Sequence, residues 1–135
     1  MGLLPSKKGV KNLNDVRTEN VAIPVDEAGL LFPHFGRAQR LLIAHVADGQ
    51  VRATTTLEVG WGESHERMED SPAAHGQHHK SVLDLLREHQ VNTVLAGGMG
   101  GAMYDMRRHQ GIVTVVGLAG EANALVEAYA QGRLA

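Results

Sequence analysis

The sequence predicts an α/β domain built on a mixed five-stranded sheet flanked by helices. Three observations support this. Short β-rich runs fill the first half of the chain after residue 19, and an Asp-Gly pair separates two of them. In the second half, helix-patterned segments alternate with short apolar strands. An Asp-Gly pair between β-rich runs is typical of a hairpin, and alternating helices and strands are typical of parallel crossovers.

Residues 1–19 are polar, lack a sustained hydrophobic period, and are predicted to form a flexible extension ahead of a single domain at 20–135. The run VAIPV at 21–25 is the first expected strand. Pro24 argues against the middle of a fully paired strand, unless it lies where an N–H group is not needed. RLLIAHVA (40–47) and QVRATTTLEV (50–59) are expected to pair as a hairpin.

The rest of the chain is expected to alternate helices and strands after a long polar loop at 60–76. In chain order the predicted elements are a helix through SVLDLLREHQ, a strand through NTVL, a glycine-rich turn, a helix through AMYDMRRHQ, a strand through IVTVVG and a helix through EANALVEAYAQG, with Gly132 at its end. Right-handed crossovers then give the strand order 3-2-1-4-5, with the first, fourth and fifth strands parallel. Ligands of such sheets sit beyond the carboxyl ends of the parallel strands.

The composition of the chain argues against several kinds of partner and binding site. The 135 residues carry a formal net charge of −2, so neither nucleic acid nor an anionic membrane is an expected partner. The chain has no cysteine, which excludes disulfides, thiolate zinc sites and clusters held by protein thiolates. No stretch approaches the roughly 20 apolar residues of a membrane span, and no signal peptide is apparent, so a cytoplasmic protein is expected.

Three of the eight histidines, His75, His78 and His79, lie in the segment HGQHH just before the first expected helix. They continue a stripe through positions 82, 85, 86 and 89, which is the spacing of one helix face. If the helix begins near His75, the three imidazoles share the face that carries Val82 and Leu86 and form a candidate metal site. If it begins near Lys80, the segment is a polar loop; the two interpretations carry equal weight.

Topology brings other groups to the same sheet edge. His34 follows the first strand, the turn Gly97–Gly101 follows the fourth, and His65 lies in the long loop. Imidazole suits zinc, copper, nickel and iron alike. The glycines admit two interpretations of equal weight: backbone N–H groups approaching an anion, or tight packing at a strand-to-helix turn. His45, His89 and His109 are interpreted as structural residues.

Catalytic motifs are lacking. The segment HGQHH is not H-E-x-x-H, because it has no glutamate to act as a general base, and no serine occurs in a G-x-S-x-G context. The turn GGMGG matches neither a dinucleotide fingerprint nor a phosphate-binding loop with its lysine. The motifs therefore leave an enzyme open but do not support one, and the leading hypothesis, together with the resemblance described next, is a non-enzymatic binding protein.

Several motifs together resemble a known family. VAIPVDE, HFGRAQRLLI and VNTVLAGGMGGAMYDMRRHQGIVTVVG are similar to the dinitrogenase iron–molybdenum cofactor biosynthesis family, which includes NifX-type carriers and the C-terminal domain of NifB-type proteins. The resemblance spans about residues 20–132. It implies a ribonuclease-H-like sheet and a protein that binds an iron–molybdenum or related metal–sulfur cofactor and passes it between donor and acceptor assembly proteins.

The resemblance also implies a ligand set. The histidine of the HFG motif, His34, is the family position associated with the cofactor, and Arg37 offers charge-assisted bonds to an anionic cluster. The predicted cofactor-binding residues are His34, Phe35, Gly36, Arg37, Gly97, Gly98, Gly100 and Gly101, and the predicted metal ligands are His34, His75, His78 and His79. The alternative is a simple divalent transition metal such as Zn²⁺ held by the extra histidines, in a regulatory or metal-dependent enzyme domain.

Overall fold

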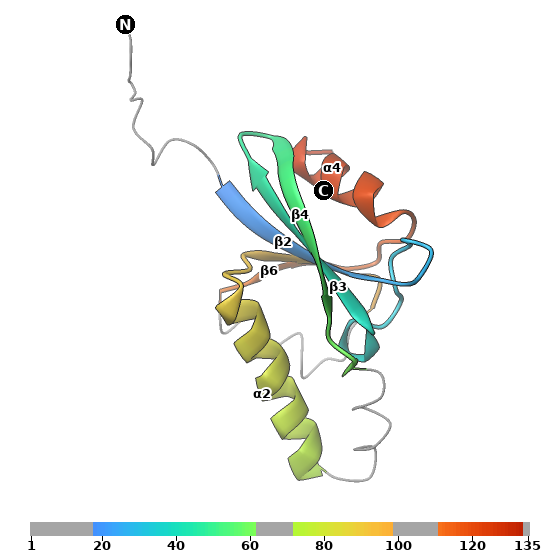
Figure 1. The fold of residues 1–135 in the computed structure, drawn as a ribbon, viewed down its shortest axis with the longest axis vertical. Helices are drawn as coiled ribbons and strands as arrows, with labels where there is room; N and C mark the ends of the chain where they lie inside the picture. Colours follow the sequence, from blue (N-terminus) through green and yellow to red (C-terminus); the bar gives the residue numbers. More distant parts are fainter. Residues whose placement is uncertain (1–17, 62–71, 99–110, 134–135) are drawn as a thin grey trace, which may run out of the picture.

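The computed structural model describes residues 18–61, 72–98 and 111–133, with side chains from Lys80 onward in the second range. Five strands form one sheet in the order β4-β3-β2-β5-β6, which confirms the predicted order (Figure 1). The strands are β2 (Thr18–Val25), β3 (Arg40–Ala47), β4 (Gln50–Glu58), β5 (Thr93–Leu95) and β6 (Val113–Val115). β2, β5 and β6 are parallel, while β3 is antiparallel to both of its neighbours. The ribonuclease-H-like label stays a prediction.

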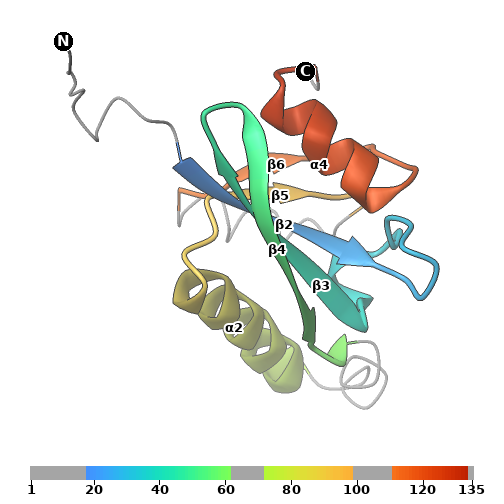
Figure 2. The ribbon, with the colours of Figure 1, turned by 45° about the horizontal axis from the view of Figure 1, so that its top comes forward.

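Helices lie on both faces of the sheet. Figure 2 shows α2 (Pro72–Glu88) on one side and α4 (Ala122–Ala130) on the other, and a short 3-10 turn, η2 (Phe35–Arg37), follows β2. α2 begins at Pro72, a residue type suited to the first helical turn, so the expected loop at 60–76 extended too far. The helix expected through AMYDMRRHQ lies outside the described residues.

β2 starts three residues earlier than predicted, at Thr18, which pairs with Ala47. Pro24 occupies a central strand, but the parallel ladder to β5 ends at Ala22. The Asn20 carbonyl accepts a hydrogen bond from the Asn92 N–H, so the peptide groups of Asn20 face β5. Because peptide groups alternate in direction along a strand, those of Pro24 face the same side, beyond the end of the ladder. The missing N–H of Pro24 is therefore not needed for pairing. Pro24 thus lies inside a strand at a position that tolerates it, as the sequence analysis allowed.

The hairpin between β3 and β4 turns at the predicted pair. Asp48 and Gly49 have φ values of 56° and 81°, the left-handed combination that two-residue hairpins with a right-handed twist require. A bulge between His45 and Val46 adds one residue to β4 near this turn. Side chains of β3 contribute to the hydrophobic clusters on both faces of the sheet, Leu41 to one and Leu42 to the other.

Each face has its own hydrophobic cluster. Under α2, Val82 and Leu86 pack with residues from the loop after β2 and from β5; the buried members are Ala22, Phe35, Ala38, Leu41, Trp61, Val82, Leu86, Val91, Val94 and Ala96. Under α4, Ala122 and Val126 cover the other side; the buried members are Val21, Ile23, Val25, Leu31, Leu42, Ala44, Val46, Leu95, Ala122 and Val126. Burial of these side chains is the main stabilising term of the fold.

Both helices end in the same hydrogen-bonded motif. At the end of α2 the Val91 N–H donates to the Leu86 carbonyl (2.9 Å), with Gln90 at φ 55°. At the end of α4 the Arg133 N–H donates to the Ala128 carbonyl (2.8 Å), with Gly132 at φ 76°. A left-handed residue followed by a bond of this kind is a Schellman cap. The role predicted for Gly132 is confirmed. Within the described ranges, no helix is long and apolar enough to cross a membrane.

A polar cluster joins three elements at the amino edge of the sheet. Glu19 Oε1 accepts a hydrogen bond from Thr93 Oγ1 (2.8 Å) and another from the Tyr129 hydroxyl (2.7 Å). The Thr93 and Tyr129 oxygens are themselves 3.1 Å apart. Because Glu19 is on β2, Thr93 on β5 and Tyr129 on α4, the cluster fixes α4 against the parallel strands.

Thr93→Val should lower the free energy of unfolding by about 1–2 kcal/mol, because it removes a donor to a partly buried carboxylate while preserving side-chain shape. Thr93 is 1% exposed, whereas Thr18 is exposed, so Thr18→Val is the matched control and should change stability by less than about 0.5 kcal/mol. Urea unfolding followed by circular dichroism measures both. Equal effects of the two substitutions would contradict the role of the cluster.

Stability should also fall at alkaline pH. Burial raises the pKa of Tyr129, and the nearby Glu19 carboxylate raises it further, while the hydrogen bond with Thr93 opposes them. A raised pKa means that the contribution to stability is complete below the ordinary tyrosine value of about 10 and is lost as pH rises through the folded-state value. Unfolding measured at a series of pH values should show a shallower alkaline decline in Tyr129→Phe than in the natural protein. Parallel declines would refute the coupling.

Candidate functional site

The loop after β2 folds back onto the carboxyl edge of the sheet. The Phe32 N–H donates to the Pro24 carbonyl (2.9 Å), and the Phe35 N–H donates to the Gly98 carbonyl (3.2 Å). His34 and Gly98 form an isolated parallel bridge. The structure thus brings His34 next to the turn after β5, at the edge where topology places them. Their role as ligands stays a prediction.

Phe35 anchors this loop. Its side chain is fully buried, and its ring lies 5.4 Å from that of Trp61, with 59° between the ring planes. Adjacent His34 is exposed. Phe35 therefore has a structural role whether or not it also touches a cofactor. Trp61 was not predicted as part of this region, although a lone tryptophan directly after an expected strand is a signal of packing at the end of that strand.

The 3-10 turn η2 holds the backbone on the other side of His34. The Arg37 N–H donates to the His34 carbonyl (3.0 Å), and the Ala38 N–H donates to the Phe35 carbonyl (3.3 Å). The Arg37 side chain is exposed. An imidazole and a guanidinium are thus carried on one short turn whose backbone is fixed at both ends, while both side chains remain accessible to a ligand.

The first two glycines of the GGMGG turn are closely packed by backbone. A Cβ on Gly97 would lie 3.2 Å from the Leu118 carbonyl oxygen and 3.4 Å from that of Pro33. A Cβ on Gly98 would lie 3.3 Å from the same Pro33 oxygen. Tight packing therefore accounts for these two glycines, and the Gly98 carbonyl is already engaged by Phe35. Gly100 and Gly101 lie outside the described residues.

The segment HGQHH is helical, because α2 starts at Pro72. Positions 75, 78 and 79 are therefore in register with Val82 and Leu86, both 0% exposed. Figure 1 shows the amino-terminal turns of α2 running past the end of the sheet. The side chains of these histidines lie outside the described part, as do His65 and His109, so the predicted cluster of His75, His78 and His79 stays a prediction.

Two other histidines have local roles. His45 is exposed on β3, and its Nδ1 lies 2.9 Å from Asn20 Oδ1 on the neighbouring strand. His89 follows the last turn of α2, and its carbonyl accepts a bond from the Asn20 side-chain amide (3.3 Å). Both are near the amino edge of the sheet, remote from His34. Within the described ranges, no three His, Asp or Glu side chains are grouped closely enough to hold a metal ion.

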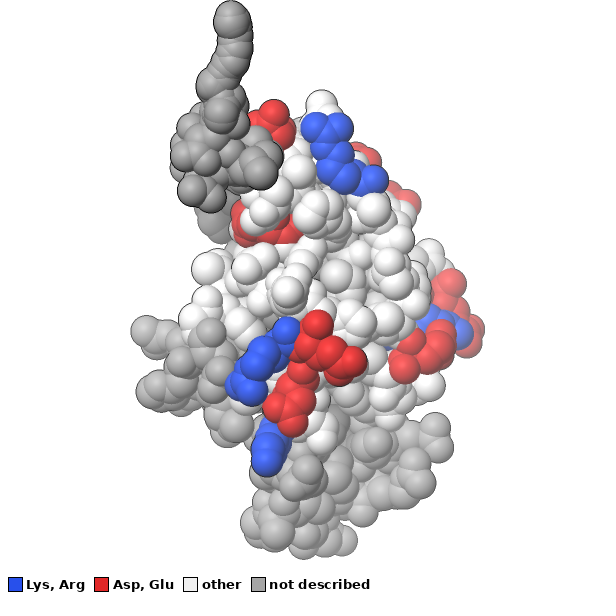
Figure 3. Space-filling model, turned by 60° about the vertical axis from the view of Figure 1, so that its left-hand side comes forward, with Lys and Arg blue, Asp and Glu red and all other residues white. Residues whose placement is uncertain are grey.

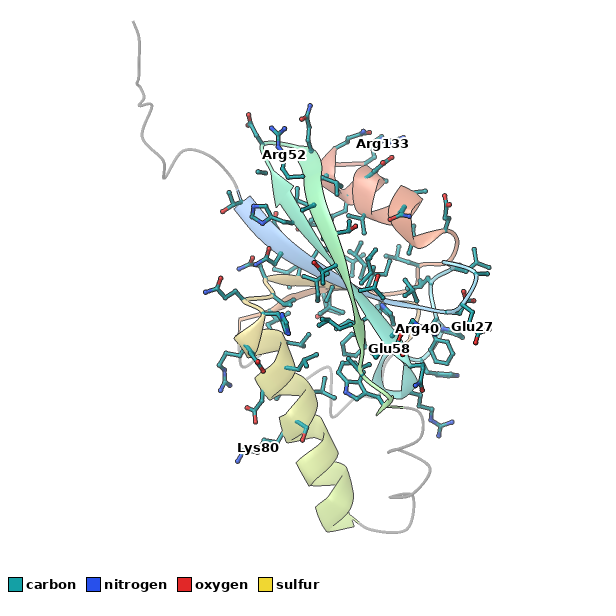
Figure 4. All side chains as sticks on the ribbon, in the orientation of Figure 1. Glu27, Arg40, Arg52, Glu58, Lys80 and Arg133 are labelled. Atoms are coloured by element: carbon teal, nitrogen blue, oxygen red, sulfur yellow. The ribbon has the colours of Figure 1, made fainter. Side chains whose placement is uncertain are left out.

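A groove on the α4 face opens at the same carboxyl edge. It has a volume of about 500 Å³, and its walls include Asp26, Arg40 and Asn123. Arg40 forms an ion pair with Glu58 across β3 and β4, and Figure 4 shows the two side chains together at this end of the strands. Basic and acidic groups are mixed on the face shown in Figure 3, so that face carries no field of a single sign.

Comparison with known proteins gives a family match. The family described as Dinitrogenase iron-molybdenum cofactor matches residues 19–132. No curated relative matches the sequence.

Several solved structures share the fold. PH0822 is 22% identical, with a TM-score of 0.68, over 86% of this chain and 94% of that one. The apo form of the orange protein from Desulfovibrio gigas is 18% identical, with a TM-score of 0.63, over 88% and 92%. MJ0327 from Methanocaldococcus jannaschii is 15% identical, with a TM-score of 0.60, over 88% and 94%. At these identities the likeness is one of fold.

Gly97→Ala should lower the free energy of unfolding by about 1–2 kcal/mol, because the added methyl group meets two backbone carbonyls that can only move with their loops. His34→Ala, a change of an exposed side chain on the neighbouring loop, is the control and should cost less than about 0.5 kcal/mol. Chemical denaturation of both variants measures the difference. A Gly97→Ala protein as stable as the natural one would show that the turn accommodates a side chain.

Proposed function

The chain belongs to the dinitrogenase iron–molybdenum cofactor family, and we propose that it is a non-enzymatic carrier for a metal–sulfur cofactor of the iron–molybdenum type. The observation that supports this best is the bridge between His34 and Gly98, which holds an exposed imidazole on a fixed backbone at the carboxyl edge. Ligands of α/β sheets bind at this edge.

The donor chemistry fits a cluster that is bound and then released. Because the chain has no cysteine, a cluster would bring its own sulfide and dock through imidazole. His34 would supply the ligand and Arg37, on the same turn, a charge-assisted bond to an anionic cluster. Few protein ligands mean weak attachment, which suits a carrier better than a permanent redox centre.

The histidines of α2 extend this site in the proposal. Since the helix begins at Pro72, positions 75 and 79 are four residues apart and positions 75 and 78 three apart, the spacings that stack side chains on one face. His75, His78 and His79 would then approach the cofactor from the helix while His34 approaches from the loop. In the proposal, Gly97 and Gly98 shape the edge through their close packing, while Gly100 and Gly101 would be the positions at which backbone approaches the cofactor.

As a carrier, the protein would exchange the cofactor with donor and acceptor assembly proteins. Family membership associates the chain with cofactor assembly and supports partners of this kind. We place the exchange at the carboxyl edge, because the loop at His34 and the first turns of α2 both reach it.

A second candidate is a mononuclear site for a divalent ion such as Zn²⁺. The helical start of HGQHH favours it specifically, because histidines one turn apart on a helix can bind the same ion. Such a site would need His75, His78 and His79 but not His34.

His34→Ala should reduce binding of isolated iron–molybdenum cofactor about tenfold or more, because it removes the ligand held on the fixed loop. Anaerobic gel filtration with iron and molybdenum analysis of the protein peak measures retention in the untagged chain. His45→Ala is the matched control, since His45 is exposed on the same sheet but engaged with Asn20. Retention by His34→Ala equal to that of His45→Ala would overturn the proposal.

The divalent alternative has its own test. If it holds, His75→Ala/His79→Ala should abolish Zn²⁺ binding in a calorimetric titration while His34→Ala preserves it. If the carrier proposal holds, both variants should lose retention of the iron–molybdenum cofactor.

A further inference from the structure

The outer edge of β4 has a self-complementary sequence. Reading outward from Thr55, Thr54 is matched by Thr56, Ala53 by Leu57, and Arg52 by Glu58. Two copies of this strand placed antiparallel about a twofold axis at Thr55 would put these residues opposite one another. Threonine would then face threonine, apolar residues would face each other, and each arginine would face a glutamate.

The backbone of β4 fits the same register. The Val59 N–H donates to the Gln39 carbonyl (2.9 Å), so it points toward β3. In an antiparallel ladder the direction alternates, which puts the peptide groups of Thr55 toward β3 and those of Thr54 and Thr56 toward the open side. A twofold at Thr55 pairs Thr54 with Thr56 of a second copy, and these are the residues whose peptide groups point outward.

β4 carries few of the features that usually block edge pairing. It is nine residues long and contains no proline and no lysine, and its one irregularity is the bulge at Arg52, which leaves the ladder from Ala53 to Glu58 regular. Among the strands of the described ranges β4 is at the edge of the sheet, and the side chains of Ala53 through Thr56 are exposed. Long edge strands of this kind readily pair with another strand.

We propose that the chain forms a symmetric dimer through antiparallel pairing of β4 with β4 of a second copy, centred on Thr55. Figure 4 shows Arg52 and Glu58 at opposite ends of β4, so the twofold brings Arg52 of each copy to Glu58 of the other. The two sheets join into one of ten strands, five from each copy. An edge contact of this kind buries little surface, so the dimer belongs to the weak class of interfaces and dissociates on dilution.

The register is tested with single cysteines, since the natural chain has none. In Thr55→Cys the two thiols of a dimer lie in a non-hydrogen-bonded pair with Cα atoms about 4.5 Å apart, within disulfide range. In the matched control Thr54→Cys they are offset by two residues and lie beyond the roughly 7 Å limit. Under the same mild oxidation, Thr55→Cys should form a covalent dimer about tenfold faster or more, because paired thiols have a high effective concentration.

The association itself is measured by sedimentation velocity over a range of concentrations. The natural chain and Lys80→Glu should dimerise alike. Arg52→Glu makes the same change of charge but places a carboxylate opposite Glu58 of the second copy, so its dimer affinity should be weaker by about tenfold or more. Thr54→Pro should be monomeric, since it removes an outward N–H and blocks a second strand; circular dichroism checks its fold. A natural chain that stays monomeric at every concentration, dimers unaffected by Arg52→Glu, or equal cross-linking of the two cysteine variants would overturn the proposal.

Discussion

The close approach of two backbone segments at the carboxyl edge is the constraint on which the site depends. The Pro33 carbonyl lies against Gly97 and Gly98, and this proximity lets the Phe35 N–H reach the Gly98 carbonyl. With Phe35 buried against Trp61, the adjacent His34 is left exposed. Glycine in the turn and an aromatic anchor in the loop therefore act together, because the loss of either contact would release the loop that carries the imidazole.

The two ends of the sheet are built differently. At the amino edge, Glu19, Thr93 and Tyr129 join three elements through side-chain hydrogen bonds. At the carboxyl edge, the connections around His34 are made by backbone groups, which leaves its side chain available. A binding site needs accessible side chains on a fixed frame, and backbone pairing provides the frame without consuming them. The polar cluster at the opposite edge contributes stability away from the site.

Local sequence chemistry predicted much of the fold. The Asp48–Gly49 turn, the strand order and the cap at Gly132 all follow from rules that act over a few residues or on crossover handedness. The start of α2 at Pro72 was missed, because a polar, histidine-rich segment gives little periodic signal. The contact between Phe35 and Trp61 was also missed, since it joins residues 26 positions apart in sequence. Topology predicted that His34 meets the glycine turn, but whether the α2 histidines reach it depends on the angle of that helix across the sheet, which no local pattern encodes.

The proposed dimer and the proposed carrier role are compatible in geometry. A twofold at Thr55 reverses β4, so the carboxyl edge of one copy lies beside the amino edge of the other. The two His34 sites would then be at opposite ends of the joined sheet, and neither would obstruct the exchange of a cofactor at the other. Arg52 of the second copy would come next to the Arg40–Glu58 pair beside the groove on the α4 face. Pairing would therefore add a cation at the rim of each carboxyl edge, where an anionic cluster would benefit from it.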